Sequence, residues 1–241
     1  MITRIIIFFF LFKSFYSYSQ EYLPVSNGEV INHTYYTLSY SELHEQAEWV
    51  HYKLSPAMIN GSFKRTNNFR QDKKVSTGSA TSTDYQNPDY QRGHLAPAAD
   101  MKLSNNMMSE SFLLSNISPQ NKSFNKGGWL QLEKLVRFWG SNSTLYITTA
   151  GILTDRPLNQ IGRNNVTVPA RFYKIIFDPK KQEVISFIMP NSKINNDLDY
   201  YIVTVDAIEE ITGIDFLSDL DDEIEDKIED KIDIKNFKIN P

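Results

Sequence analysis

The amino-acid sequence predicts a single α+β domain built around a central, mostly antiparallel sheet. Strand-like runs rich in aromatic and branched residues recur along the chain, and irregular loops separate them. Two or three segments have the apolar spacing of a helix, and no internal repeat is present. A chain of 241 residues is long enough to bury one ordinary hydrophobic core.

The N-terminal residues 1–19 have the pattern of a secretory signal peptide. Arg4 precedes an apolar run at 5–12, small residues follow, and cleavage is expected before Gln20. The apolar run is too short to cross a bilayer as a helix, and no later segment approaches about 20 uninterrupted apolar residues. We therefore expect a protein that has no membrane span and is secreted or periplasmic.

The first elements of the mature chain are a strand and a long loop. Residues 47–54 alternate and are rich in aromatic and branched side chains, which predicts a strand, and Ser55-Pro56 ends it. Residues 67–89 are polar and predict a loop that delivers the chain to a tight turn at 92–94. Loops of this length are often functional.

The middle of the chain contains the most strongly predicted helix. A short helix is expected at 104–111, then a strand at 112–117 and a break at 118–120. The helix at 129–139 follows from apolar residues at helical spacing, namely Trp129, Leu130, Leu132, Leu135, Val136 and Trp139.

The C-terminal half predicts buried strands followed by a second helix. Strands are expected at 145–150, 172–178 and 184–189, with loops at 155–157 and 178–179. An amphipathic helix at 197–211 is closed by Gly213. The apolar residues that follow, up to Leu217, are expected to pack back onto the body.

Residues 219–241 form an acidic tail after a domain at 20–218. The run 219–233 has nine acidic residues against two lysines, and its isoleucines at 224, 228 and 232 make only a narrow apolar stripe. Such a segment forms a marginal helix or none. Two interpretations stay open: a solvated extension, or a tail that competes with substrate or binds a basic partner or inhibitor.

Composition excludes several kinds of site. The chain has no cysteine, so it has no disulfide, no thiolate nucleophile and no cysteine-based zinc site. The formal net charge is −4, but residues 53–74 have a local basic excess over the single Asp72. This stretch fits either a surface that meets a polyanion or an ordinary solvated face.

Two neighbouring motifs suggest phosphate chemistry. Residues 90–101 set Arg92 and His94 beside a glycine, and a basic side chain with a titratable imidazole suits attack on a phosphate. About thirty residues later, Asn125 opens a helical pattern that contains Glu133 and Arg137. At 100° per residue these three lie within about 120° of one helix, so they are expected to face one ion. The pattern indicates a metal-assisted phosphodiesterase.

These motifs resemble the DNA/RNA non-specific endonucleases. The family has Asp-Arg-Gly-His followed by Leu-Ala-Pro-Ala-like residues, and residues 91–98 follow this pattern with Gln91 in place of the aspartate. Residues 114–120 look like the family's Leu-Ser-Asn-Ile-x-Pro-Gln segment, and residues 125–133 look like its Asn-x-Gly-x-Trp-x-x-Leu-Glu segment. Weaker similarity covers nearly the whole mature chain.

The resemblance implies a ββα-metal active-site motif, also called a His-Me finger. In it His94 is the general base, and Asn125 is the one direct protein ligand of Mg²⁺, or of Mn²⁺ in its place. Glu133 would hydrogen-bond water around the ion, and Arg92 and Arg137 would neutralise charge on the phosphate. Gln91 can still form hydrogen bonds but supplies no negative charge.

Other residues are assigned more simply. Arg65 is expected to contact a further phosphate, because it lies in the basic stretch where the family has an arginine. Asn116 and Gln120 are expected to shape the end of a strand. The remaining histidines, His33, His44 and His51, are expected to be structural.

The expected function is magnesium-dependent endonucleolytic hydrolysis of DNA and RNA without sequence preference, leaving 5′-phosphate ends. Two alternatives stay open: a phosphodiesterase of the same fold that acts on small nucleotides, and a catalytically impaired nucleic-acid-binding protein. Gln91 is the only sequence hint of the second alternative. The sequence leaves the oligomeric state open, including a homodimer.

Overall fold

A seven-stranded antiparallel sheet crosses the molecule. The computed structural model describes residues 21–25, 28–154, 158–232 and 237–239. The predicted signal peptide and the predicted loop at 155–157 lie outside the described residues. From edge to edge the strands are β1 (Glu29–Asn32), β2 (Thr37–Ser41), β3 (Gln46–Leu54), β6 (Leu145–Gly151), β9 (Arg171–Asp178), β10 (Glu183–Pro190) and β11 (Ile202–Val203).

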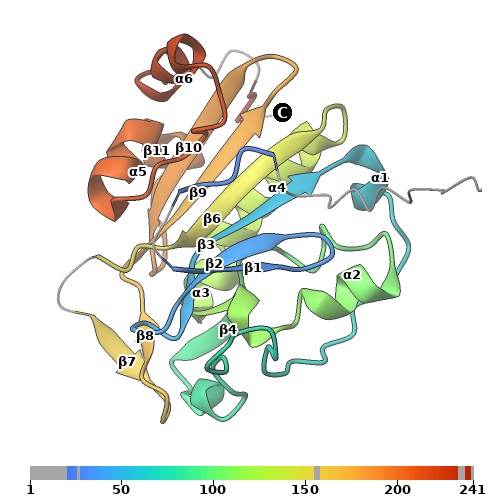
Figure 1. Ribbon diagram of the computed structural model, residues 1–241, viewed down its shortest axis with the longest axis vertical. Helices are drawn as coiled ribbons and strands as arrows, with labels where there is room; N and C mark the ends of the chain where they lie inside the picture. The colour runs from blue at the N-terminus through green and yellow to red at the C-terminus, as the bar shows by residue number, and fades with distance from the viewer. Residues whose placement is uncertain (1–20, 26–27, 155–157, 233–236, 240–241) are drawn as a thin grey trace, which may run out of the picture.

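Helices and two small sheets surround the large sheet, which confirms the α+β prediction (Figure 1). The helices are α1 (Pro56–Ile59), α2 (Asn105–Glu110), α3 (Lys122–Lys126), α4 (Gly128–Gly140), α5 (Val205–Thr212) and α6 (Asp222–Glu229). The small sheets pair β4 (Tyr90–His94) with β5 (Ile117–Asn121) and β7 (Asn159–Ile161) with β8 (Val166–Val168). Among the described residues, no helix combines the length and apolar character that a membrane crossing needs.

Helix α4 extends the predicted helix at 129–139 by one residue at each end. Its apolar face is buried, including Trp129, Leu132 and Trp139. The Trp129 ring lies 5.7 Å from the ring of Phe172 on β9, so the helix packs against the large sheet. Packing against the sheet therefore fixes the helix that provides Glu133.

The structure corrects the predicted strand at 112–117 and the predicted break at 118–120. Residues Leu114–Asn116 form a 3-10 turn, and the strand β5 begins only at Ile117. Residues 92–94, predicted as a turn, belong to strand β4 and pair with residues 117–119 of β5. Pro119 lies inside β5, opposite Arg92. A two-stranded sheet consists only of edge strands, where a proline is tolerated.

The predicted helix at 197–211 is also wrong in its first half. Leu198–Tyr201 is a 3-10 turn, and β11 then pairs with β10 at the edge of the sheet. Helix α5 starts only after Thr204, whose side chain accepts a hydrogen bond from the backbone of Ala207. Gly213, with φ of 70°, ends α5 as predicted.

The acidic tail packs onto the body, contrary to the solvated interpretation. Ile228 of α6 is buried, and the Phe237 side chain is only 1% exposed. Phe237 lies edge-on to Trp139 at 5.0 Å, and the Trp139 indole donates to the backbone carbonyl of Lys238. The narrow isoleucine stripe contributes one buried residue, and the aromatic residue beyond the acidic run supplies further apolar contact.

Candidate active site

Strands β4 and β5 followed by helix α3 form a compact ββα unit beside the large sheet. The two strands pair in register, with Gly93 opposite Ser118 and His94 opposite Ile117. A Cβ atom on Gly93 would lie 2.2 Å from the side chain of Gln120, so only glycine allows this approach. The unit places the His94 strand directly against the segment that leads into Asn125.

A pocket of about 410 Å³ opens on the ββα unit. It collects five of the six predicted site residues, and its polar lining consists of Arg65, Gln91, Arg92, His94, Asn125, Lys126 and Glu133. Arg137 does not line it. Residues that lie 68 positions apart in sequence, from Arg65 to Glu133, therefore share one pocket.

His94 is a buried imidazole at the floor of this pocket. The residue is 9% exposed, and its ring lies 5.5 Å from Phe69 and 4.9 Å from Phe112. Its Nε2 atom has no hydrogen-bond partner in the described part of the chain. Burial, and then the charges of Arg65 and Arg92, lower the pKa of His94 to about 3. The ring is therefore neutral at physiological pH and has a nitrogen free to accept a proton.

The two guanidinium groups beside His94 each lie over an aromatic ring. Arg92 lies 4.2 Å from the ring centre of Phe69, and Arg65 lies 4.8 Å from that of Phe112. Arg65 also donates from Nε to the side chain of Asn67 at 2.7 Å. Two oriented cations at the mouth of a pocket form a suitable site for a phosphate.

Asn125 lies on α3, and this corrects the expectation that it shares one helix with Glu133 and Arg137. Gly127 has φ of −108° and ψ of −111°, values outside the helical region, and it separates α3 from α4. The Asn125 amide nitrogen donates to Gln91 Oε1 at 3.2 Å. Because Gln91 takes the amide nitrogen, the Asn125 oxygen remains available as a ligand.

Glu133 of α4 lies near a buried lysine that the sequence analysis missed. Burial raises the pKa of Glu133 to about 7, although the charge of Lys174 opposes the rise. Burial likewise lowers the pKa of Lys174 to about 8, and its Nζ lies 4.7 Å from the ring centre of Trp129. A lysine inside an otherwise apolar strand was the available sequence signal.

Arg137 points its charge at a carboxylate instead of the pocket. Its guanidinium donates to Asp100 Oδ1 at 2.8 Å, and the hydroxyl of Tyr52 donates to the other oxygen of Asp100 at 2.8 Å. Asp100 follows the Arg-Gly-His motif but received no role from the sequence. Asp100 is therefore a second buried carboxylate near Glu133, and its charge raises the pKa of Glu133 further.

The three histidines expected to be structural, and Asn116, have partners that fit that role. His33 Nε2 lies 2.8 Å from Asp72, and His44 and His51 each lie within hydrogen-bond distance of a threonine hydroxyl. Asn116 bonds the backbone of Ala96 through both ends of its amide. It therefore holds the loop that follows His94.

The basic stretch at 53–74 does not form one surface. Arg65 reaches the pocket, whereas Arg70 donates to backbone carbonyls and Lys53 lies 3.9 Å from Glu21. A different basic surface adjoins the pocket: a hollow of about 780 Å³ is lined by Lys122, Lys126 and Lys193 among other residues. Lys126 lines both hollows.

Comparisons with known proteins point to one family. The sequence model of the family described as DNA/RNA non-specific endonuclease matches residues 17–223. A nuclease of Nostoc sp. is 33% identical over 214 residues, which cover 83% of this chain and 74% of the relative. Mitochondrial endonuclease G of Bos taurus is 30% identical over 202 residues, 77% of this chain and 68% of the relative.

The three-dimensional fold is similar to that of a solved structure from an endonuclease G complex. A chain in the crystal structure of the EndoG/EndoGI complex, which describes the mechanism of EndoG inhibition, superimposes with a TM-score of 0.74. It is 27% identical in sequence, and the match covers 82% of this chain and 89% of that one. The similarity therefore extends over the sheet as well as the motifs.

Proposed function

This chain belongs to the DNA/RNA non-specific endonuclease family, and from that premise we propose that it is a metal-dependent endonuclease that cuts DNA and RNA without sequence preference and leaves 5′-phosphate ends. The observation that supports this most directly is the His94 ring, neutral and with an unpartnered Nε2, in one pocket with two guanidinium groups. It offers a proton acceptor beside a site for a phosphate.

The donor atoms in the pocket fit a hard divalent cation such as Mg²⁺ or Mn²⁺. Asn125 would hold it through its side-chain oxygen, because Gln91 accepts from the amide nitrogen and sets the orientation. Magnesium keeps most of its own water, so one neutral oxygen with substrate phosphate is a sufficient anchor. When bound, such an ion polarises the phosphate and neutralises charge that develops on it.

His94 would act as the general base. Its low pKa keeps the ring neutral before substrate arrives, so one ring nitrogen is able to accept a proton. A bound phosphate places negative charge next to Arg65 and Arg92 and offsets their effect on the imidazole, so the basicity of His94 rises when a proton has to be accepted from water. The same two arginines would bind the phosphate and stabilise its extra charge during the attack.

Glu133 and Arg137 take different roles in this proposal. Glu133 lines the pocket, and burial raises the pKa of its carboxyl, so this group can orient water through a hydrogen bond. Arg137 contacts Asp100 and acts as a positioning residue for the buried carboxylates behind the pocket.

A polynucleotide fits the surface better than a small nucleotide does. The lysine-lined hollow beside the pocket would bind phosphates on either side of the bond that is cut. Contacts of this kind position the backbone and read no bases, which agrees with cleavage of both DNA and RNA.

The test is a side-by-side digestion with the mature protein. The protein is incubated, with Mg²⁺ or with a chelator, with each of three substrates: supercoiled plasmid, RNA and a small phosphodiester. The proposal expects metal-dependent cleavage of both polymers and little turnover of the ester. Preferred hydrolysis of the ester would favour the small-nucleotide alternative, and binding of plasmid without cleavage would favour the impaired binding protein.

Export is part of the same proposal. The signal-peptide pattern at 1–19 supports a secreted or periplasmic protein. Mass spectrometry of the protein recovered outside the cytoplasm should find Gln20, or a residue next to it, at the N-terminus. An exported protein that retains Met1 would contradict the assignment.

A further inference from the structure

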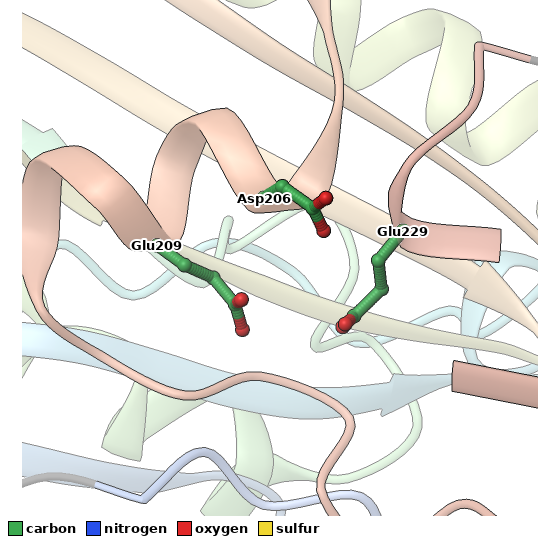
Figure 2. Close-up of side chains that lie close together, drawn as sticks. All are labelled: Asp206, Glu209 and Glu229. Carbon is green, nitrogen blue, oxygen red and sulfur yellow. The ribbon is translucent and has the colours of Figure 1, made fainter. Parts of the chain in front are cut away.

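Two carboxylates of α5 and one of α6 converge where these helices approach each other. Asp206 and Glu209 lie on α5, and Glu229 is the last residue of α6 (Figure 2). One ligand oxygen from each of them lies within 4.8 Å of the others. Both helices contact β10, and none of the three residues lines the active-site pocket.

Glu229 distinguishes this group from an ordinary exposed acidic surface. The residue is 6% exposed, and its Oε1 has no hydrogen-bond partner among the described residues. Figure 2 shows its carboxylate directed toward that of Glu209. An unpaired carboxylate in a buried position is costly, so the group needs a positive partner or a proton.

The surroundings of Glu229 add more negative charge. Burial and the charges of Glu209, Glu225, Asp206 and Asp215 raise its pKa to about 9. Lys231, two residues after Glu229 in the chain, lies 3.5 Å from Asp230. A proton on Glu229 would neutralise one charge of this group, whereas a divalent cation would neutralise two and give each carboxylate a ligand bond.

The spacing and rigidity of the oxygens suit calcium. Ca²⁺ binds carboxylate oxygens at about 2.3–2.6 Å, so oxygens on opposite sides of the ion lie up to about 5 Å apart. The group satisfies this limit as it stands. Glu209 is already fixed, because its Oε1 accepts from the backbone nitrogen of Phe216 at 2.7 Å. Asp206 is exposed and gives solvent and ions access to the group.

We propose that Asp206, Glu209 and Glu229 form a Ca²⁺ site that joins α5 to α6 and holds the acidic tail on the body. The site is separate from the catalytic pocket in both place and ligand chemistry. Its consequence is structural: the tail that contains the buried Ile228 and Phe237 docks more tightly when the cation is bound.

Calorimetric titration of the metal-free mature protein with CaCl₂ tests the site. The proposal expects one Ca²⁺ per chain in the wild type and at least a tenfold weaker affinity in Glu229→Gln. Asp206→Asn, at an exposed position, should weaken binding as well without disturbing the packing. Glu223→Gln makes the same charge change at an exposed position of α6 outside the group and should bind as the wild type does.

Asn125→Ala separates this site from the catalytic one. It removes the proposed ligand in the pocket, so Ca²⁺ binding that survives in Asn125→Ala and is lost in Glu229→Gln belongs to the α5–α6 site. Binding that disappears only in Asn125→Ala, or that is unchanged in Glu229→Gln and Asp206→Asn, would overturn the proposal while leaving the nuclease assignment intact.

Limited proteolysis gives a second readout that does not depend on affinity. A lysine-specific protease should cut after Lys227 and Lys231 more slowly when the wild type is given Ca²⁺. The rate for Glu229→Gln should not respond to Ca²⁺, whereas Glu223→Gln should respond as the wild type does. A wild-type rate that is the same with Ca²⁺ and with chelator would show that a proton alone neutralises Glu229, and the proposal would be wrong.

Discussion

The side-chain amide of Asn125 donates to Gln91 Oε1 at 3.2 Å, and this bond links strand β4 to helix α3. Gln91 lies where the family's Asp-Arg-Gly-His motif has an aspartate. The glutamine keeps a hydrogen-bond acceptor but lacks the negative charge of the aspartate. The neutral amide therefore preserves the orientation of Asn125. It leaves Arg65 and Arg92 as the charges that lower the pKa of His94.

Gln91→Leu should weaken metal binding without abolishing cleavage. The leucine removes the acceptor that orients Asn125, and the loss of such an outer partner typically costs about 10–100-fold in metal affinity. A Mg²⁺ titration of plasmid cleavage would measure the shift in the concentration for half-maximal rate. Gln160→Leu, at an exposed position of β7, is the matched control. An unchanged Mg²⁺ requirement in Gln91→Leu would remove the positioning role.

His94→Ala and Asn125→Ala should fail in different ways. Loss of a general base lowers turnover by about 10²–10⁴ and leaves metal and substrate binding nearly intact. Asn125→Ala should instead raise the amount of Mg²⁺ needed for the remaining activity. Added imidazole is expected to restore part of the rate of the first variant only. Plasmid cleavage by His94→Ala at the wild-type rate would refute the assignment of the base.

The His94 imidazole should remain neutral well below its usual pKa of 6.5 in the free protein. The pKa of His94 in the folded protein is about 3, which is lower than in the unfolded chain. The contribution of this imidazole to the stability of the fold is therefore present above pH 6.5 and is lost as the pH falls toward 3. Arg65→Met should raise the pKa toward 6.5 but not restore it, because burial is the largest cause. An NMR titration of the ring would detect both values, and a wild-type ring that titrates near 6.5 would contradict the structure.

Neutralising the lysines of the neighbouring hollow should affect polymers selectively. Lys122→Gln and Lys193→Gln together should weaken plasmid binding and lower the dependence of log affinity on log salt by up to about 2 units, because these two lysines line the hollow and not the pocket. Hydrolysis of a small diester should change little, because that substrate does not reach the hollow. Lys180→Gln, outside the hollow, serves as the control. Equal losses on both substrates would indicate damage to the pocket itself.

Truncation after Leu220 should destabilise the protein, contrary to the interpretation of the tail as a solvated extension. Burying an apolar side chain such as Ile228 or Phe237 contributes about 1.5–3 kcal/mol, and each kcal/mol shifts Tm by about 2–4 °C for a chain of this size. Phe237→Ala alone should lower Tm measurably in a thermal melt. Ile232→Ala, at a residue that is 54% exposed, should not. Equal melting temperatures for the truncated and full mature chains would show that the tail does not pack on the body.

Local patterns in the sequence determined much of the fold and most of the pocket. Helix α4 and strand β3 follow from the period of their apolar residues, because that period reports which side of an element is buried. Strands β6, β9 and β10 follow from nearly continuous apolar runs, which are typical of strands buried on both faces. The Arg-Gly-His motif and the Asn-x-Gly-x-Trp motif led to four residues that do line one pocket, and the basic stretch at 53–74 led to a fifth, Arg65. Residue types at fixed spacing identify the chemistry without knowledge of the fold.

Only the tertiary structure decided how these elements meet. The pairing of β4 with β5 and the contact of Arg137 with Asp100 depend on residues far apart in sequence. The same is true of the buried Lys174 and of Glu229 beside α5. Burial and electrostatic interaction depend on distance in space, which periodicity along the chain does not specify. The sequence therefore identified the reactive groups, and the packing of the chain determined their orientation and charge.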